Sequence, residues 1–330
     1  MASVPKIKRS PDPNLNGDDP AGAFALLADG AQRGLTGTLI TIVGIEGGAP
    51  RALGAHMAVL SDGTYCGYVS GGCVEASIAG EALNALNSGK DTVLRFGLNS
   101  PFLDIRLPCG GGIDVHVHVN PAPSLINETL EALAHRHAFT LELVPSTGAA
   151  RFVSGTNPHA VSGWDKRTFF RRYKPKTQLV LVGRGLEFET MLRIAQAADF
   201  ELAAFSPDEH STEFAQNLGV SATRLIGLSD APSLPIDRWS AVVFLFHDHD
   251  WETVMLMQAL ESHAFFVGAL GSRNTHSTRC ARLRDQGVTE AALARIKGPI
   301  GMFGPTRDAT SLAVSALAQI IEERRAFDVL

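Results

Sequence analysis

Two cysteines of this chain lie beside runs of glycine. Cys73 follows Gly71 and Gly72, and Cys109 precedes Gly110 and two further glycines. A thiolate is a nucleophile and a soft metal ligand, and glycine lets the backbone approach a bound molecule closely. We interpret these five residues as binding residues and expect the two thiols to converge on one wall of a ligand site. The alternative is that both cysteines are small buried packing residues.

A third glycine loop presents an arginine. Gly47-Gly48-Ala49-Pro50-Arg51 follows the run LITIV, which is typical of a strand, so we expect Arg51 at a strand end. The segment after Cys73 is rich in Ala and Leu and predicts a helix that ends at Gly89. The N-terminus of such a helix favours an anion or a thiolate, and Glu75 in its first turn partly opposes this effect.

The second half opens with a strand, a glycine turn and a helix. Gly183-Arg184-Gly185 resembles the start of a dinucleotide fingerprint, but Phe188 replaces its third glycine. Asp208 comes two positions later than the acidic residue that would hold a ribose. The pattern therefore predicts the nucleotide-binding fold and argues against NAD.

Two later strands in this half also end in polar residues. AVVFLF delivers His247 to its carboxyl end, and AFFVGAL leads to Gly271, Ser272 and Arg273 before a helix. In an open α/β sheet the carboxyl ends of the strands form the ligand edge. We expect His247 and the Gly271–Arg273 turn to bind a ligand there, the turn as an anion site.

The run IDVHVHV alternates strictly, with Asp114, His116 and His118 on one face. A metal site near Cys109 is conceivable, yet the spacing matches no usual zinc pattern. We predict a solvated strand face and no metal. Cys66 and Cys280 lack a neighbouring glycine loop and are expected to be packing residues.

The amino-acid composition argues against several classes of protein. The 330 residues carry 29 Lys and Arg against 34 Asp and Glu, with a pI of about 6.1. The mild acidity argues against nucleic acid as a partner, and no apolar run is long enough to span a membrane. Four cysteines without a CxxC pair predict reduced thiols, and the chain is expected to be cytoplasmic.

The chain is long enough for two domains after a short tail. We expect a disordered tail over 1–20, a mixed α/β domain with the glycine and cysteine loops over 21–172, and a Rossmann-like, doubly wound parallel-sheet domain over 173–330. Residues 145–176 read as irregular. The fold class is therefore α/β in both domains.

Together these motifs resemble one family, the xanthine dehydrogenase accessory proteins of the XdhC/CoxI type. The resemblance rests on GGAPRALGAHMAV, GYVSGGCVEASI and PCGGGIDV in the first half, and on LVGRG and VGALGSR in the second. It covers most of the chain. The chain departs from the family pattern at Phe205-Ser206-Pro207-Asp208 and at GMFGPTRDATSL.

The resemblance implies a chaperone without turnover of its own. Such a protein binds the molybdenum cofactor (molybdopterin) in its mononucleotide or cytosine dinucleotide form. It holds the cofactor while a cysteine desulfurase supplies sulfur, and delivers it to an apo-molybdoenzyme of the xanthine dehydrogenase family. A cofactor nucleotidyltransferase is a further partner in the dinucleotide case, and a homodimer is the expected assembly.

Two other classes remain open. An NAD(P)-dependent oxidoreductase would use the second domain for its cofactor and His247 as acid or base. A zinc hydrolase built on Cys109, His116 and His118 is the least favoured.

Overall fold

The computed structural model describes residues 5–12, 20–72, 74–102, 107, 110–155, 157, 160–228, 231–246 and 250–329. Contacts between Cα atoms divide the chain between Pro175 and Lys176 into two compact units. The sequence places this boundary between residues 172 and 173.

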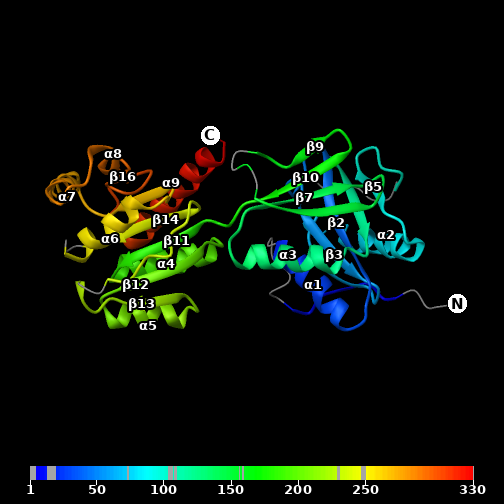
Figure 1. The fold of residues 1–330 in the computed structure, drawn as a ribbon, viewed down its shortest axis with the longest axis horizontal. Coiled ribbons are helices and arrows are strands. Elements are labelled where there is room, and N and C mark those ends of the chain that lie inside the picture. Colours follow the sequence, from blue (N-terminus) through cyan, green and yellow to red (C-terminus); the bar gives the residue numbers. More distant parts are fainter. Residues whose placement is uncertain are drawn as a thin grey trace. The chain divides into compact units, whose positions relative to one another are not determined.

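The first unit is built on a six-stranded sheet in the order β1-β4-β3-β2-β6-β5 (Figure 1). Its strands are β1 (Lys8–Arg9), β2 (Gly37–Glu46), β3 (His56–Leu60), β4 (Thr64–Gly67), β5 (Thr92–Gly97) and β6 (Gly112–Val119). Its helices are α1 (Pro20–Gln32), α2 (Glu75–Ser88) and α3 (Pro123–Ala134). α2 ends where the sequence predicts, because Gly89 adopts φ 65° at its C-cap.

Different elements pack on the two faces of this sheet. Ile40 and Ile42 of β2 pack with α2, whereas Leu39 of the same strand packs with α1, α3 and a second sheet. That second sheet has the order β8-β7-β10-β9. Its strands are β7 (Phe139–Val144), β8 (Ala149–Ser154), β9 (Gly163–Asp165) and β10 (Thr168–Tyr173).

The second sheet corrects the sequence prediction of an irregular segment over 145–176. Strands β8 to β10 are short and largely half-exposed, and their polar and apolar residues do not alternate regularly. Their order comes from antiparallel pairing with β7 and with each other, which the local sequence does not encode.

Part of the predicted disordered tail over 1–20 is a strand in the structure, whereas residues 1–4 and 13–19 lie outside the described residues. Lys8 and Arg9 pair in parallel with Thr64 and Tyr65 of β4. The edge of β4 offers unpaired backbone groups, and the N–H groups of Lys8 and Ser10 donate to Gly63 O and Tyr65 O. Composition alone does not reveal this edge.

The second unit has a six-stranded parallel sheet in the order β13-β12-β11-β14-β15-β16. Its strands are β11 (Gln178–Gly183), β12 (Glu201–Ser206), β13 (Ser221–Arg224), β14 (Ser240–Leu245), β15 (Phe266–Ala269) and β16 (Ile296–Lys297). Its helices are α4 (Leu186–Ala197), α5 (Glu209–Asn217), α6 (Asp250–Glu261), α7 (Arg273–Asp285), α8 (Glu290–Leu293) and α9 (Ala309–Val329).

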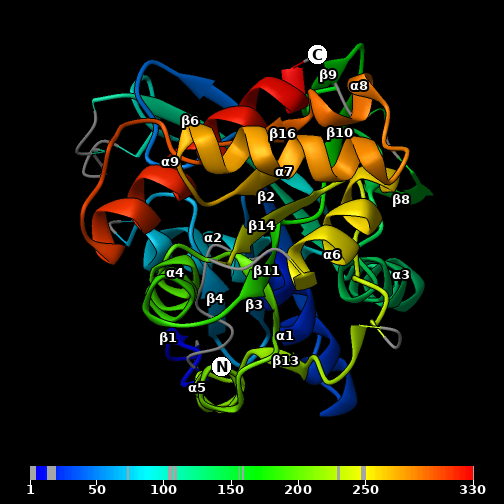
Figure 2. The same ribbon diagram turned by 90° about the vertical axis from the view of Figure 1, so that its left-hand side faces the viewer.

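Helices cover both faces of this parallel sheet. One core contains residues of α4, α5 and α9, and the other contains residues of α6, α7 and α8. Figure 2 shows α4 and α6 on opposite sides of β11. The predicted mixed domain followed by a doubly wound, Rossmann-like domain is therefore confirmed. Among the described helices, none is both long and apolar enough to cross a membrane.

Candidate functional site

Three glycine loops of the first unit meet at one edge of its six-stranded sheet. Glu46, which ends β2, pairs with Gly112, which begins β6, and Gly97, which ends β5, pairs with the same Gly112. Gly67 ends β4 beside Met57 of β3. The loops after β2 and β4 and the loop before β6 therefore leave the sheet at one edge.

Close backbone contacts join these loops. A methyl group on Gly111 would collide with the carbonyl oxygen of Gly48, and one on Gly71 would lie 3.8 Å from the Pro50 side chain. The Gly47–Arg51 loop therefore lies between the loops that carry Gly71–Gly72 and Gly110–Gly111. Cys73 and Cys109 themselves lie outside the described residues.

The glycines next to the two cysteines are exposed and left-handed. Gly71, Gly72 and Gly110 have φ values of 80°, 107° and 72°. Among the described residues other than the adjoining ones, no atom lies within 4 Å of the Cβ position of Gly72 or Gly110. An L-residue at these positions would be strained, and the space beside the backbone is open to a ligand. We call these three residues, together with Gly47 and Gly48, the glycine rim.

Glu75 holds the loop before α2 in place. Its Oε1 accepts the N–H groups of Val69 (3.1 Å) and Ser70 (2.8 Å), and its Oε2 accepts the Ser70 hydroxyl (2.7 Å) and the Val74 N–H (3.2 Å). Burial alone would raise the pKa of Glu75, but these hydrogen bonds lower it below the ordinary value. The sequence indicates Glu75 as a nearby charge but gives no sign of its hydrogen bonds to the loop before α2.

This arrangement argues against the anion site that the sequence predicts at the N-terminus of α2. The ionised Glu75 carboxylate places a negative charge in the first turn of α2 and accepts the N–H group of Val74, the N-cap residue. A phosphate therefore needs another binding group, because a second negative charge at this position would be repelled.

Arg51 is a cationic residue at this edge. It is half-buried, and its guanidinium carbon lies 5.5 Å from the centre of the Tyr68 ring, on which Arg9 also packs at 4.7 Å. The Tyr68 ring thereby supports both arginines through cation–π contact.

Arg95 ties together the strand ends that carry the glycine rim. Its Nη1 donates to both oxygens of Asp114 (3.0 and 3.1 Å), its Nε donates to Leu98 O (2.8 Å), and its Nη2 bonds Glu46. The sequence gives no local signal for this cluster, since its members come from three strands.

In the second unit, Gly183 and Gly185 lie at the carboxyl end of β11. A methyl group on Gly183 would lie 2.5 Å from Leu245 O of the neighbouring β14, so this position excludes a side chain. Gly185 has φ 82°, precedes α4 and donates its N–H to the Ser211 hydroxyl (3.1 Å). β11 and β14 are the central pair at which the strand order reverses, the usual ligand position in such sheets.

The described residues around this turn lack the usual NAD features. Phe188, at the third glycine position, is fully buried in the core of α4, α5 and α9. β12 ends at buried Ser206, and Asp208 is the N-cap of α5, where it accepts the Ser211 N–H at 2.9 Å. No acidic side chain therefore ends β12 in a position to bind a ribose.

The Gly271–Arg273 turn lies after β15 at the same edge of the parallel sheet. Gly271 has φ 131°, and Ser272 caps α7 by accepting the Thr275 N–H. Arg273 is exposed, and no described side chain pairs with its guanidinium. His247, predicted at the end of β14, lies outside the described residues.

The predicted solvated face of β6 is wrong. His116 and His118 are 0% and 6% exposed, because they share a face with Thr41 and Leu39 of β2 and the second sheet covers this face. Both rings bond one oxygen of Asp91, which precedes β5. The sequence analysis did not identify Asp91, which lies 25 residues before His116.

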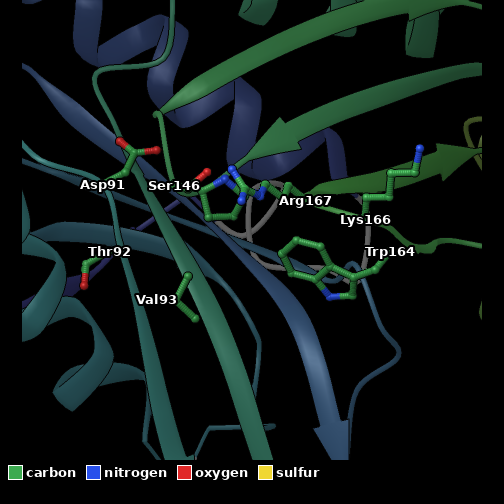
Figure 3. A pocket seen from close by; sticks show the side chains of 8 residues that line it. Asp91, Thr92, Val93, Ser146, Trp164, Lys166 and Arg167 are labelled. Atoms are coloured by element: carbon green, nitrogen blue, oxygen red, sulfur yellow. The ribbon is translucent and has the colours of Figure 1, made fainter.

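The pKa of Asp91 is strongly lowered. Burial by itself would raise it, but hydrogen bonds from His116, His118 and the Val119 N–H outweigh this effect. Asp91 also lines a cavity of about 580 Å³ between β5 and the second sheet (Figure 3).

The remaining cysteines agree in part with the packing prediction. Cys66 is fully buried and donates to Gly22 O at 3.2 Å, and burial raises the pKa of its thiol to about 12. Cys280 is half-buried, with its sulfur 3.6 Å from His276 Nε2.

Comparison with known proteins gives the family. The model of the XdhC and CoxI family matches residues 31–97, and the XdhC Rossmann domain matches residues 179–320. The chain is 34% identical over 307 residues to the molybdenum cofactor insertion chaperone PaoD of Escherichia coli, covering 93% of this chain and 89% of that protein. The chain belongs to the XdhC/CoxI family, as its motifs predicted.

Two further relatives support this membership and the fold. The chain is 26% identical over 325 residues to a probable xanthine dehydrogenase subunit of Bacillus subtilis, covering 87% of this chain and 93% of that protein. A crystal structure from Bacillus halodurans, described as a xanthine dehydrogenase, has the same fold with a TM-score of 0.71 at 19% identity. That match covers 92% of this chain and 96% of the other.

Proposed function

We propose that the protein is a molybdenum cofactor chaperone that holds the cofactor during sulfuration and inserts it into a xanthine dehydrogenase or aldehyde oxidase-family apoenzyme. The observation that carries the proposal is the meeting of three glycine loops at one sheet edge, two of which contain a cysteine in the sequence. The 34% identity to a cofactor insertion chaperone supports it.

The residues of this edge fit the chemistry of the cofactor. The open space beside Gly72 and Gly110 admits a flat pterin close to the backbone. The thiols of Cys73 and Cys109 are soft ligands for molybdenum or carriers of the sulfur passed to it. When bound, the cofactor supplies a molybdenum dithiolene, which the protein must shield from oxidation.

The phosphate end of the cofactor requires a cationic partner. Because the ionised Glu75 already lies in the first turn of α2, we assign this role in the first unit to Arg51. Within the second unit, the Gly183–Gly185 turn and the Gly271–Arg273 turn are candidate phosphate sites of their own. Arginine forms bidentate, charge-assisted hydrogen bonds with phosphate. His247 is included in the proposed binding set from its place after β14.

The partners follow from this role. They are the apo-molybdoenzyme, a cysteine desulfurase and, for the cytosine dinucleotide form, a nucleotidyltransferase. We further propose a cytoplasmic homodimer that acts as an accessory protein and turns over no substrate.

Mass spectrometry of protein produced in a molybdenum-replete host tests the proposal. We expect a released molybdopterin or its cytosine dinucleotide, and activation of an apo-molybdoenzyme by the loaded protein. NADH and NADPH titrations are the counter-test. Micromolar binding of either, without any pterin, would favour the NAD(P)-dependent oxidoreductase instead.

A further inference from the structure

The strongest feature outside the glycine rim is a buried cluster of two histidines and one carboxylate. Asp91 Oδ2 lies 2.8 Å from His116 Nε2 and 2.8 Å from His118 Nδ1. The Val119 N–H donates to Asp91 Oδ1 at 2.9 Å. One ligand atom from each of the three side chains lies within 4.8 Å of the other two.

The Asp91 carboxylate carries a negative charge, and two neutral histidines do not compensate it. The hydrogen bonds to Asp91 favour its ionised form, and the Asp91 side chain is only 9% exposed. Within the described ranges, no Lys or Arg side chain bonds Asp91. Because a buried charge without a counter-charge is costly, the cluster needs a cation, which is either a proton on a histidine or a metal ion.

The donor types select the class of metal. Imidazole nitrogens suit zinc, cobalt and nickel, whereas magnesium and calcium prefer oxygen ligands. Bonds of about 2.0–2.2 Å around tetrahedral zinc place ligand atoms roughly 3.3 Å apart. The two 2.8 Å pairs therefore need to open by about half an ångström.

The cavity beside Asp91 gives an ion a route to the cluster through Asp91, the member of the cluster that lines it. Figure 3 shows Asp91 and Val93 on one wall, with Ser146 and Trp164 opposite. A site with three protein ligands and one open position is the usual arrangement of an accessible zinc ion.

We propose that Asp91, His116 and His118 bind one zinc-type divalent cation, with solvent from the cavity at the remaining position. Each imidazole then carries its proton on the nitrogen that faces away from the ion. For His116 this nitrogen is Nδ1, which is buried without a hydrogen-bond partner among the described atoms. A missing partner of this kind lowers metal affinity by about 10–100-fold, so we expect weaker binding than at a site where every imidazole has such a partner.

Isosteric substitutions separate a metal site from a hydrogen-bond cluster. In His116→Gln with His118→Asn, the side-chain amides place N–H groups near the positions of Nε2 and Nδ1 and still donate to Asp91, but they are poor zinc ligands. The matched control is His135→Gln with His137→Asn, because these two exposed histidines also lie close together, with ring centres 5.9 Å apart. Asp91→Asn removes the charge instead of the nitrogens.

The measurement is cobalt and zinc titration of the full-length, metal-free protein without a histidine tag, followed by visible absorption and thermal unfolding. We expect one cobalt ion per chain, with a four-coordinate visible spectrum, and a higher unfolding temperature with zinc for wild type and control. The isosteric pair and Asp91→Asn should each bind at least about 10-fold more weakly, a loss of about 1.4 kcal/mol or more.

Three results would overturn the proposal. They are wild-type protein that takes up no cobalt or zinc, an isosteric pair that binds as tightly as wild type, and near-ultraviolet sulfur-to-cobalt charge transfer, which would place the ion at the cysteines. None of these measurements requires the molybdenum cofactor. A negative result for the metal site therefore leaves the proposed function unaffected, and a negative result for the function leaves the metal site unaffected.

Discussion

Glu75 binds Ser70 twice, through the Ser70 N–H at 2.8 Å and the Ser70 hydroxyl at 2.7 Å. This pair fixes the backbone that leads into Gly71 and Gly72. A buried carboxylate a few residues away therefore fixes the conformation of this loop. Gly71 and Gly72 can then remain exposed to a ligand while the loop stays ordered.

Glu75→Gln should destabilise the first unit and weaken cofactor binding. The amide replaces one acceptor oxygen with a donor that faces N–H groups, and a buried charge-assisted hydrogen bond contributes about 1.5–3 kcal/mol. Chemical denaturation at neutral pH measures the loss. Glu81→Gln, on the less buried side of α2, is the control and should be near neutral.

The stabilities of wild type and Glu75→Gln should become more similar as the pH falls. Because the pKa of Glu75 is lowered in the folded state, its contribution to stability is present above the ordinary glutamate pKa and is lost as pH falls through the folded value. The stability difference between wild type and Glu75→Gln should therefore shrink below about pH 4.5. A difference independent of pH would show that the Glu75 charge is unimportant.

The sequence predicts the second unit better than the first, for a physical reason. β11 and β14 are continuous apolar runs that are followed in the sequence by glycine or polar residues, and this local signal does not depend on the rest of the fold. β8 becomes a strand only by pairing with β7, and β10 only by pairing with β7 and β9. The burial of His116 depends on this second sheet, so a prediction that missed the sheet had to place the histidine in solvent.

Gly111→Ala should disrupt the meeting of the glycine loops. Its Cβ would collide with backbone atoms of Gly48, which a side-chain rotation cannot relieve. Overpacking of this kind costs about 1–3 kcal/mol. Cofactor bound per folded protein should fall as well. Gly80→Ala in α2 is the control, because its Cβ would meet only the Ile7 side chain at 3.6 Å. Equal stability of the two variants would contradict the packing argument.

Arg273→Ala should lower cofactor affinity without unfolding the protein. The side chain is exposed at the start of α7, and loss of a charge-assisted phosphate contact costs about 1.5–3 kcal/mol. Equilibrium binding and thermal unfolding measure the two effects separately. Arg282→Ala, at the exposed far end of α7, should leave both unchanged. Unchanged affinity in a folded Arg273→Ala variant would mean that the phosphates bind elsewhere.

Iodoacetamide labelling tests the role of Cys73 and Cys109. Both follow or precede exposed glycines, so we expect both to be labelled in the free protein and protected when the cofactor is bound. Cys66 serves as an internal control, because its buried thiol has a pKa raised to about 12 and should stay unlabelled.

Substitution separates a cofactor site from simple packing at the same two cysteines. In a site, Cys73→Ala and Cys109→Ala each stay folded while bound molybdenum and delivery to the apoenzyme fall. In a packed core, each variant loses thermal stability and binds cofactor in proportion to its folded fraction. The helix N-terminus favours faster labelling of Cys73 than of Cys109, and the ionised Glu75 opposes it, so Glu75→Gln should accelerate labelling of Cys73 alone. Absence of labelling at both cysteines in the free protein would show that they are buried, and would remove them from the site.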